Sequence, residues 1–134
     1  MKRLVVILIP IIAGFLFSLE VYANPVFKEI SNAILDKMPQ IEMQKLIKKY
    51  HNVRIADKAY FVSFTKTVTG EMLANLTTEI DSRSPYSIGI VVSVRKAFVK
   101  HALKLKKGQR VRFSGQFVGV KMTTLLLDKG VVSR

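Results

Sequence analysis

The 134-residue sequence predicts a mainly β fold with some α-helix: a five-stranded, antiparallel barrel preceded by one or two amphipathic helices. Residues 110–117 alternate between polar and apolar side chains and place Val111, Phe113 and Phe117 on one parity, which is the period-two pattern of a half-buried strand. Apolar, β-branched runs at residues 86–94 and 122–127 indicate two more strands. Because each strand has an apolar face to cover, a curved sheet that closes on itself is the simplest arrangement.

Residues 1–23 have the pattern of a signal peptide. Lys2 and Arg3 precede an apolar run from Leu4 to Leu19, and Val21-Tyr22-Ala23 offers the small residues of a cleavage site, so we expect cleavage after Ala23. The run is shorter than the roughly 20 residues that span a bilayer; the alternative is an uncleaved N-terminal anchor. Cleavage would leave 111 residues with a net charge of +12, since it removes two basic residues and one Glu. A domain of this size without any Cys fits a periplasmic location in a bacterium.

Residues 24–55 are predicted to be a helical segment. Asn24-Pro25 is a typical start, since Asn caps a helix well and Pro fits its first position. Pro39 ends or kinks this helix, and a second apolar stripe continues to about residue 51. We expect both stripes to pack against the sheet; their members recur at helical spacing and are Phe27, Ile30, Ile34 and Met38, then Met43, Leu46, Ile47 and Tyr50.

Residues 56–134 are predicted to form the barrel. A long strand at residues 60–76 is expected to bend at Gly70, with Tyr60 and Phe64 facing inward and Phe61 facing outward. Residues 81–85 form a loop, residues 96–107 form a short cationic helix that ends at Gly108, and Gly119 supplies the turn of the last hairpin. One further strand is expected between residues 70 and 100. This order of elements fits the five-stranded barrel known as the OB fold.

Short motifs recur between about residues 44 and 132 in the order and spacing of a known family. They are Tyr50-His51-Asn52, Ala56-Asp57 and Tyr60 ahead of the first strand, Val68-Thr69-Gly70 within it, Leu105 to Val111 before a later strand, and Phe113-Ser114-Gly115 followed by Gly119. In this order they resemble the bacterial tRNA_anti-like OB-fold proteins. The resemblance implies a small, exported OB-fold protein. The family name reflects a likeness of fold to anticodon-binding modules and does not imply that tRNA is the ligand.

The sequence predicts neither an enzyme nor a metal or cofactor site. The chain has no Cys, and His51 and His101 lack acidic neighbours at the spacing of a metal site or a catalytic triad. Glu79 and Asp81 adjoin a loop with a nearby Arg, which suggests a surface ion pair. Ser114 lies outside a Gly-x-Ser-x-Gly motif.

The basic residues instead predict a binding surface. OB barrels bind polymers on a strand face, with cations for phosphates and aromatic rings for stacking. The candidate cations are Arg110, Arg112 and Lys121 on the last hairpin and Arg95, Lys96 and Lys100 nearby in sequence; the candidate rings are Phe61 and Tyr86, with Phe98 as a third. Three hypotheses remain open. In the first, the basic surface binds an anionic macromolecule or an envelope protein. In the second, the positive charge holds the protein at an anionic membrane surface. In the third, the ligand is single-stranded nucleic acid.

Overall fold

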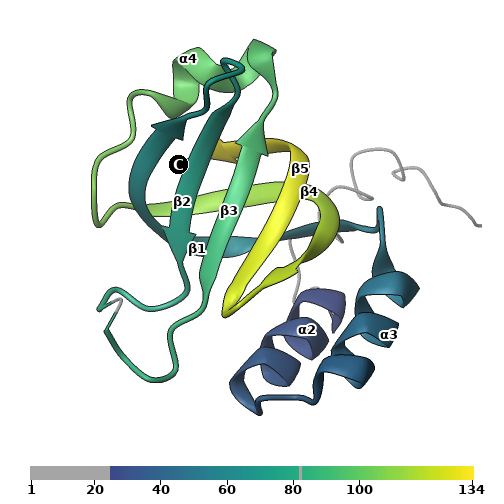
Figure 1. Ribbon diagram of the computed structural model, residues 1–134. Helices are drawn as coiled ribbons and strands as arrows, with labels where there is room; N and C mark the ends of the chain where they lie inside the picture. The colour runs from purple at the N-terminus through teal and green to yellow at the C-terminus, as the bar shows by residue number, and fades with distance from the viewer. Residues whose placement is uncertain (1–24, 82) are drawn as a thin grey trace, which may run out of the picture.

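The computed structural model describes residues 25–81 and 83–134, so the predicted signal peptide and its cleavage site lie outside the described residues. Two helices come first, α2 (Pro25–Leu35) and α3 (Gln40–Tyr50), and five strands follow (Figure 1). The strands are β1 (Arg54–Lys66), β2 (Met72–Thr77), β3 (Gly89–Val94), β4 (Arg110–Lys121) and β5 (Thr124–Ser133). Between β3 and β4 lie a 3₁₀ turn, η1 (Lys96–Phe98), and the short helix α4 (Val99–Ala102).

The strands form a closed barrel in the order β1-β2-β3-β5-β4, and the β1–β4 pairing completes the circle. This confirms the predicted five-stranded OB-like barrel preceded by two helices. The pairing of β3 with β5 is parallel and the other four pairings are antiparallel. The parallel pair arises because the chain crosses from β3 through α4 and β4 before it returns beside β3 in β5.

Apolar side chains fill the barrel, and helices cover its two ends. Val111, Phe113 and Phe117 of β4 are all buried, as the alternation predicts. At one end, α2 packs Phe27 against the ring of Phe113, with 5.6 Å between the ring centroids. At the other end, α4 buries Ala102 completely (Figure 1). The interior is therefore a packed core, and any ligand has to bind on the outside.

The predicted long strand at residues 60–76 is wrong, because the chain turns within it. β1 ends at Lys66, residues 67–71 form a turn, and β2 follows at Met72. Gly70 has a φ of +90° and donates its N–H to the carbonyl of Thr67 (2.9 Å), so it serves the turn rather than a bend in a strand. The predicted long strand therefore merged parts of two strands, the second half of β1 and most of β2, into one.

The predicted inward face of β1 is also wrong for its first half. Ile55, Ala59 and Phe61 are buried, whereas Tyr60 is half-buried. A register shift between Phe61 and Ser63 explains the difference, since one extra residue moves every later side chain to the other face. Phe64, beyond the shift, therefore packs on the core beside Phe61, with 4.8 Å between the ring centroids.

Three smaller expectations are corrected. Gly119 lies within β4, at a register shift after Phe117, and the hairpin turn comes later, between Lys121 and Thr124. The predicted helix at residues 96–107 is only η1 and α4, because the segment turns toward β4 soon after Ala102 packs. The strand predicted at residues 86–94 begins at Gly89.

We predict that Gly130→Ala destabilises the barrel strongly. A Cβ atom at this position would lie 2.2 Å from Cγ1 of Val92 and 2.7 Å from the carbonyl oxygen of Ser114, so strands on both sides of β5 would have to move. Overpacking of this kind costs roughly 1–3 kcal/mol, which corresponds to a fall in Tm of roughly 4–8 °C for each kcal/mol in a domain of about this size.

Gly119→Ala is the matched control, since its Cβ atom would meet nothing within 4 Å. Thermal unfolding of both variants followed by circular dichroism checks this prediction. Equal Tm values for the two variants would contradict the close approach of the strands at residue 130.

Candidate functional site

The outer face of β1 and β4 carries a row of exposed basic residues. The register places Lys58 opposite Arg112 and Tyr60 opposite Arg110. Lys58, Arg110 and Arg112 are exposed, and the guanidinium carbon of Arg110 lies 5.8 Å from the centroid of the Tyr60 ring. This is within the range of a cation–π contact. We call these four residues, Lys58, Tyr60, Arg110 and Arg112, the basic wall.

The basic wall holds charge that no carboxylate of the described residues neutralises through an ion pair. Two cations directly opposite each other on paired strands repel and destabilise the pairing. Over residues 25–81 and 83–134, the one ion pair with an N···O distance within 4.0 Å joins Arg83 to Asp81, so no described carboxylate pairs with the wall. Lys58 and Arg112 therefore form an exposed, like-charged cross-strand pair with no described carboxylate within ion-pair distance.

The sequence around the wall strengthens the local positive field. Between Asp81 and Asp128 the chain contains ten Lys or Arg and no Asp or Glu. Much of this charge lies on η1, α4 and the segment from α4 to Arg110, at the barrel end where β4 begins. A one-signed cluster of this kind raises the local concentration of anions and speeds their association.

The structure brings together only part of the predicted cationic patch. Arg110 and Arg112 lie together on the wall, as expected. Lys121 is exposed at the far end of β4, nine positions beyond Arg112, which is about 30 Å along a strand. Arg95, Lys96 and Lys100 are exposed at the end of the barrel rather than on its strands.

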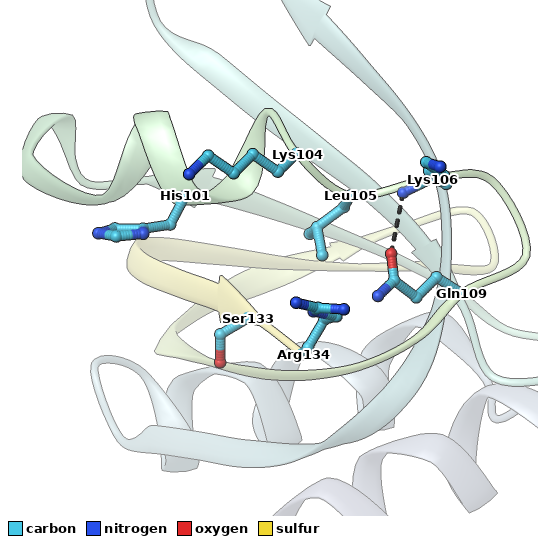
Figure 2. Close-up of a pocket in the computed structure, with 7 residues that line it drawn as sticks. All are labelled: His101, Lys104, Leu105, Lys106, Gln109, Ser133 and Arg134. Carbon is cyan, nitrogen blue, oxygen red and sulfur yellow. Dashed lines mark hydrogen bonds between the residues drawn. The ribbon is translucent and has the colours of Figure 1, made fainter.

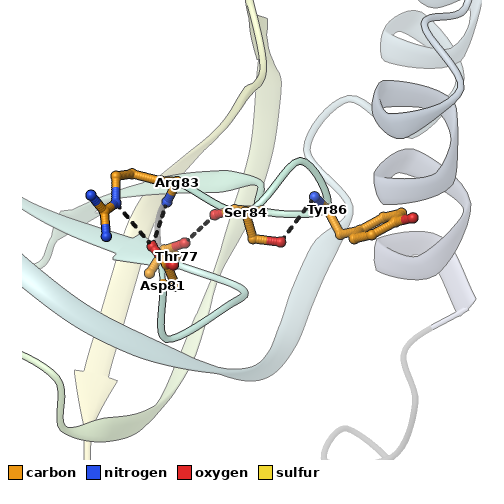
Figure 3. Close-up of polar contacts among 6 residues, drawn as sticks. Thr77, Asp81, Arg83, Ser84 and Tyr86 are labelled. Carbon is orange, nitrogen blue, oxygen red and sulfur yellow. Dashed lines mark hydrogen bonds and ion pairs between the residues drawn. The ribbon is translucent and has the colours of Figure 1, made fainter.

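Neither Phe61 nor Tyr86, the two rings predicted to stack on a ligand, lies on the basic wall. Phe61 is 5 % exposed and belongs to the core, so its assignment as a stacking residue is wrong. Tyr86 is 70 % exposed, but it lies on the connection between β2 and β3, where its side chain points toward the N-terminal helices (Figure 3). That connection is held by local hydrogen bonds, from the N–H groups of Tyr86 to Ser84 Oγ (3.2 Å) and of Arg83 to Asp81 Oδ1 (3.0 Å).

Sequence reasoning missed Lys58 and Tyr60 because it assigned the wrong face of β1 to the core. Lys58 was not recognised as an outward residue, and Tyr60 was assigned to the interior. The signal that could have found them is the pair Ile55 and Ala59, which continues the inward parity of Phe61.

The outer face of β2 and β3, where OB barrels usually bind polymers, carries no cation on its strands, and Ser93 Oγ donates a hydrogen bond to the exposed Glu71 carboxylate there. Leu73 lies opposite Ser93 and Asn75 opposite Val91, and all four are half-buried. Asn75 Nδ2 donates to Thr65 Oγ1 (2.9 Å) of β1. The β2–β3 strands therefore present neither a cation nor a ring on this face.

Among the described residues, no three His, Asp or Glu side chains gather in a way that could hold a metal ion. No helix in the described part of the chain is long and apolar enough to cross a membrane.

Comparisons with known proteins show the fold. No family model matches the chain, and no curated protein matches its sequence. A lipoprotein from Klebsiella pneumoniae, provisionally described as nucleic acid-binding, matches with a TM-score of 0.51 at 14% identity, over 70% of this chain and 81% of that one. A Plasmodium falciparum SSB in complex with ssDNA matches with a TM-score of 0.37 at 18% identity, over 59% of this chain and 90% of that one. The chain thus has an OB fold similar to that of the Klebsiella protein.

We predict that Lys58 and Arg112 repel each other measurably. A double-mutant cycle with Lys58→Gln and Arg112→Gln should give a repulsive coupling of roughly 0.2–1 kcal/mol in the free energy of unfolding. The coupling should shrink in 1 M NaCl, because salt screens exposed charges. Urea unfolding at low and high salt measures both values; a coupling of zero or an attractive one at low salt would refute the arrangement.

Proposed function

We propose that this protein is an OB-fold binding module that holds an anionic polymer along its basic wall, and that it is not an enzyme. The observation that carries the proposal is the exposed, unneutralised pair of Lys58 and Arg112 on neighbouring strands. Anionic groups bound at this pair would reduce the repulsion between Lys58 and Arg112. Binding of the polymer would therefore stabilise the pairing of β1 with β4.

The spacing of the basic wall suits an extended chain. Residues two apart on a strand are separated by about 6.7 Å, so Arg110 and Arg112 present their charges as successive points along β4. Arg110 lies over the ring of the half-buried Tyr60, and we propose that a base or sugar packs against this pair. Cations together with one ring favour a polymer that carries both phosphates and planar or cyclic groups, such as single-stranded nucleic acid.

Two further observations support this class of ligand and an envelope location. The Klebsiella protein with a similar fold is described as a nucleic acid-binding lipoprotein, although only provisionally. The pattern of residues 1–23 predicts export to the periplasm. We infer that the module meets its polymer in the cell envelope.

A membrane surface is the second candidate partner. Leu103 is 54 % exposed and lies among the exposed Lys100, Lys104 and Lys107 at the α4 end of the barrel. An exposed leucine within a lysine cluster is typical of peripheral contact with anionic lipid.

Leu103→Asp should abolish sedimentation with anionic vesicles and leave binding of a soluble polymer unchanged if both contacts exist.

We predict that Arg110→Glu combined with Arg112→Glu weakens binding of a fluorescent 20-nucleotide oligo(dT) at least tenfold at low salt. For single strands, the slope of log K against log [salt] is about −0.7 per phosphate contact, so three wall cations give a slope of about −2 and the variant a smaller one. Both side chains are exposed, and the fold should remain intact. Fluorescence anisotropy across a NaCl series measures these quantities.

Lys45→Glu with Lys48→Glu is the charge-matched control, since both lysines are exposed on α3. It should change the affinity much less than the wall variant. If the two variants lose affinity equally, net charge rather than the basic wall is responsible, and the proposal fails. Heparin in place of the oligonucleotide separates a general preference for anionic polymers from one for nucleic acid.

A further inference from the structure

A basic pocket adjoins the basic wall at the end of the barrel. It has a volume of about 600 Å³ and lies between the connection that follows α4 and the end of β5 (Figure 2). Its lining residues come from two separate parts of the chain and are His101, Lys104, Leu105, Lys106, Gln109, Ser133 and Arg134. None of them appears among the residues that the sequence predicted for binding.

The polar groups that line this pocket suit an anion. Lys104, Lys106 and Arg134 are exposed cations, and no Asp or Glu side chain is among the lining residues. The side-chain oxygen of Gln109 accepts the backbone N–H of Lys106 (3.0 Å), which turns the amide nitrogen, a donor only, toward the pocket (Figure 2). The lining therefore offers hydrogen-bond donors and positive charge at the same place.

The size of the pocket indicates more than a bare ion. A volume of about 600 Å³ lies within the range of small-molecule sites, which is much larger than a phosphate group needs. Leu105 is half-buried and gives the pocket an apolar surface beside its cations. A phosphate attached to a sugar matches this combination of charge and apolar surface better than inorganic phosphate does.

The pocket lies beside the basic wall, and its lining contains none of the four wall residues. Gln109 immediately precedes Arg110, and Ser133 lies opposite Arg112 in the β4–β5 pairing. We propose that the pocket receives the terminal, phosphorylated sugar unit of the polymer that the basic wall holds. This inference rests on the proposed function. It implies that the module recognises the end of a single strand.

The test compares 10-nucleotide oligo(dT) strands with a 5′-phosphate, with a 3′-phosphate and with neither. One of the two phosphorylated strands should bind the full-length protein about three- to tenfold more tightly than the unphosphorylated strand. Lys104→Gln with Lys106→Gln should remove this preference while the unphosphorylated strand still binds. Lys100→Gln with Lys107→Gln, which removes the same charge from exposed residues outside the pocket, should retain the preference.

The outcomes separate this inference from the proposed function. Equal affinity for all three strands overturns the pocket inference and leaves the basic wall in place. If no strand binds, the proposed function fails, and ribose 5-phosphate then tests the pocket directly. Ribose 5-phosphate should raise the Tm of the protein and of the Lys100/Lys107 variant but not that of the Lys104/Lys106 variant, whereas ribose should raise none. The absence of any such shift also counts against the pocket.

Discussion

The apolar interior of the closed barrel is the constraint on which the rest of the structure depends. Side chains alternate between the two faces of a strand, so each residue that enters the core fixes its neighbours on the outside. Val111 and Phe113 point inward and thereby hold Arg110 and Arg112 outward, while Ala59 does the same for Lys58 and Tyr60. The β1–β4 pairing that closes the barrel then sets these outward residues opposite one another, so the basic wall is built by the same contacts that stabilise the fold.

Closure of the barrel also decides where function can reside. α2 and α4 cover the two ends and the interior is filled, which leaves the outer surface for ligands. The β2–β3 strands carry no cation, the Glu71 carboxylate accepts a hydrogen bond from Ser93, and Asn75 satisfies polar groups of the neighbouring strand. The exposed positive charge lies on β1, β4 and the connection after α4. In the proposed function, the module therefore differs from the general OB pattern in the face that contacts its ligand.

The sequence predicts the fold well and the site only in part. The clean alternation of β4 gives the correct outward positions for Arg110 and Arg112, and the helical spacing gives α2 and α3. In β1, the register shift after Phe61 reverses the parity. The alternation that follows the shift therefore predicts Phe61 outside and Tyr60 inside, and only Ile55 and Ala59, before the shift, indicate the observed inward face. Lys106 and Ser133 line the same pocket only because β5 returns beside β4. This kind of proximity depends on topology rather than on local sequence.

The most direct measurement is amide chemical-shift mapping of the isotopically labelled protein during titration with a 10-nucleotide oligo(dT). If the basic wall binds the polymer, the largest perturbations will lie at residues 58–60 and 110–112, on the two strands that close the barrel. Perturbations centred on residues 73–75 and 91–93, with the wall unchanged, would place the polymer on the β2–β3 face and contradict the account.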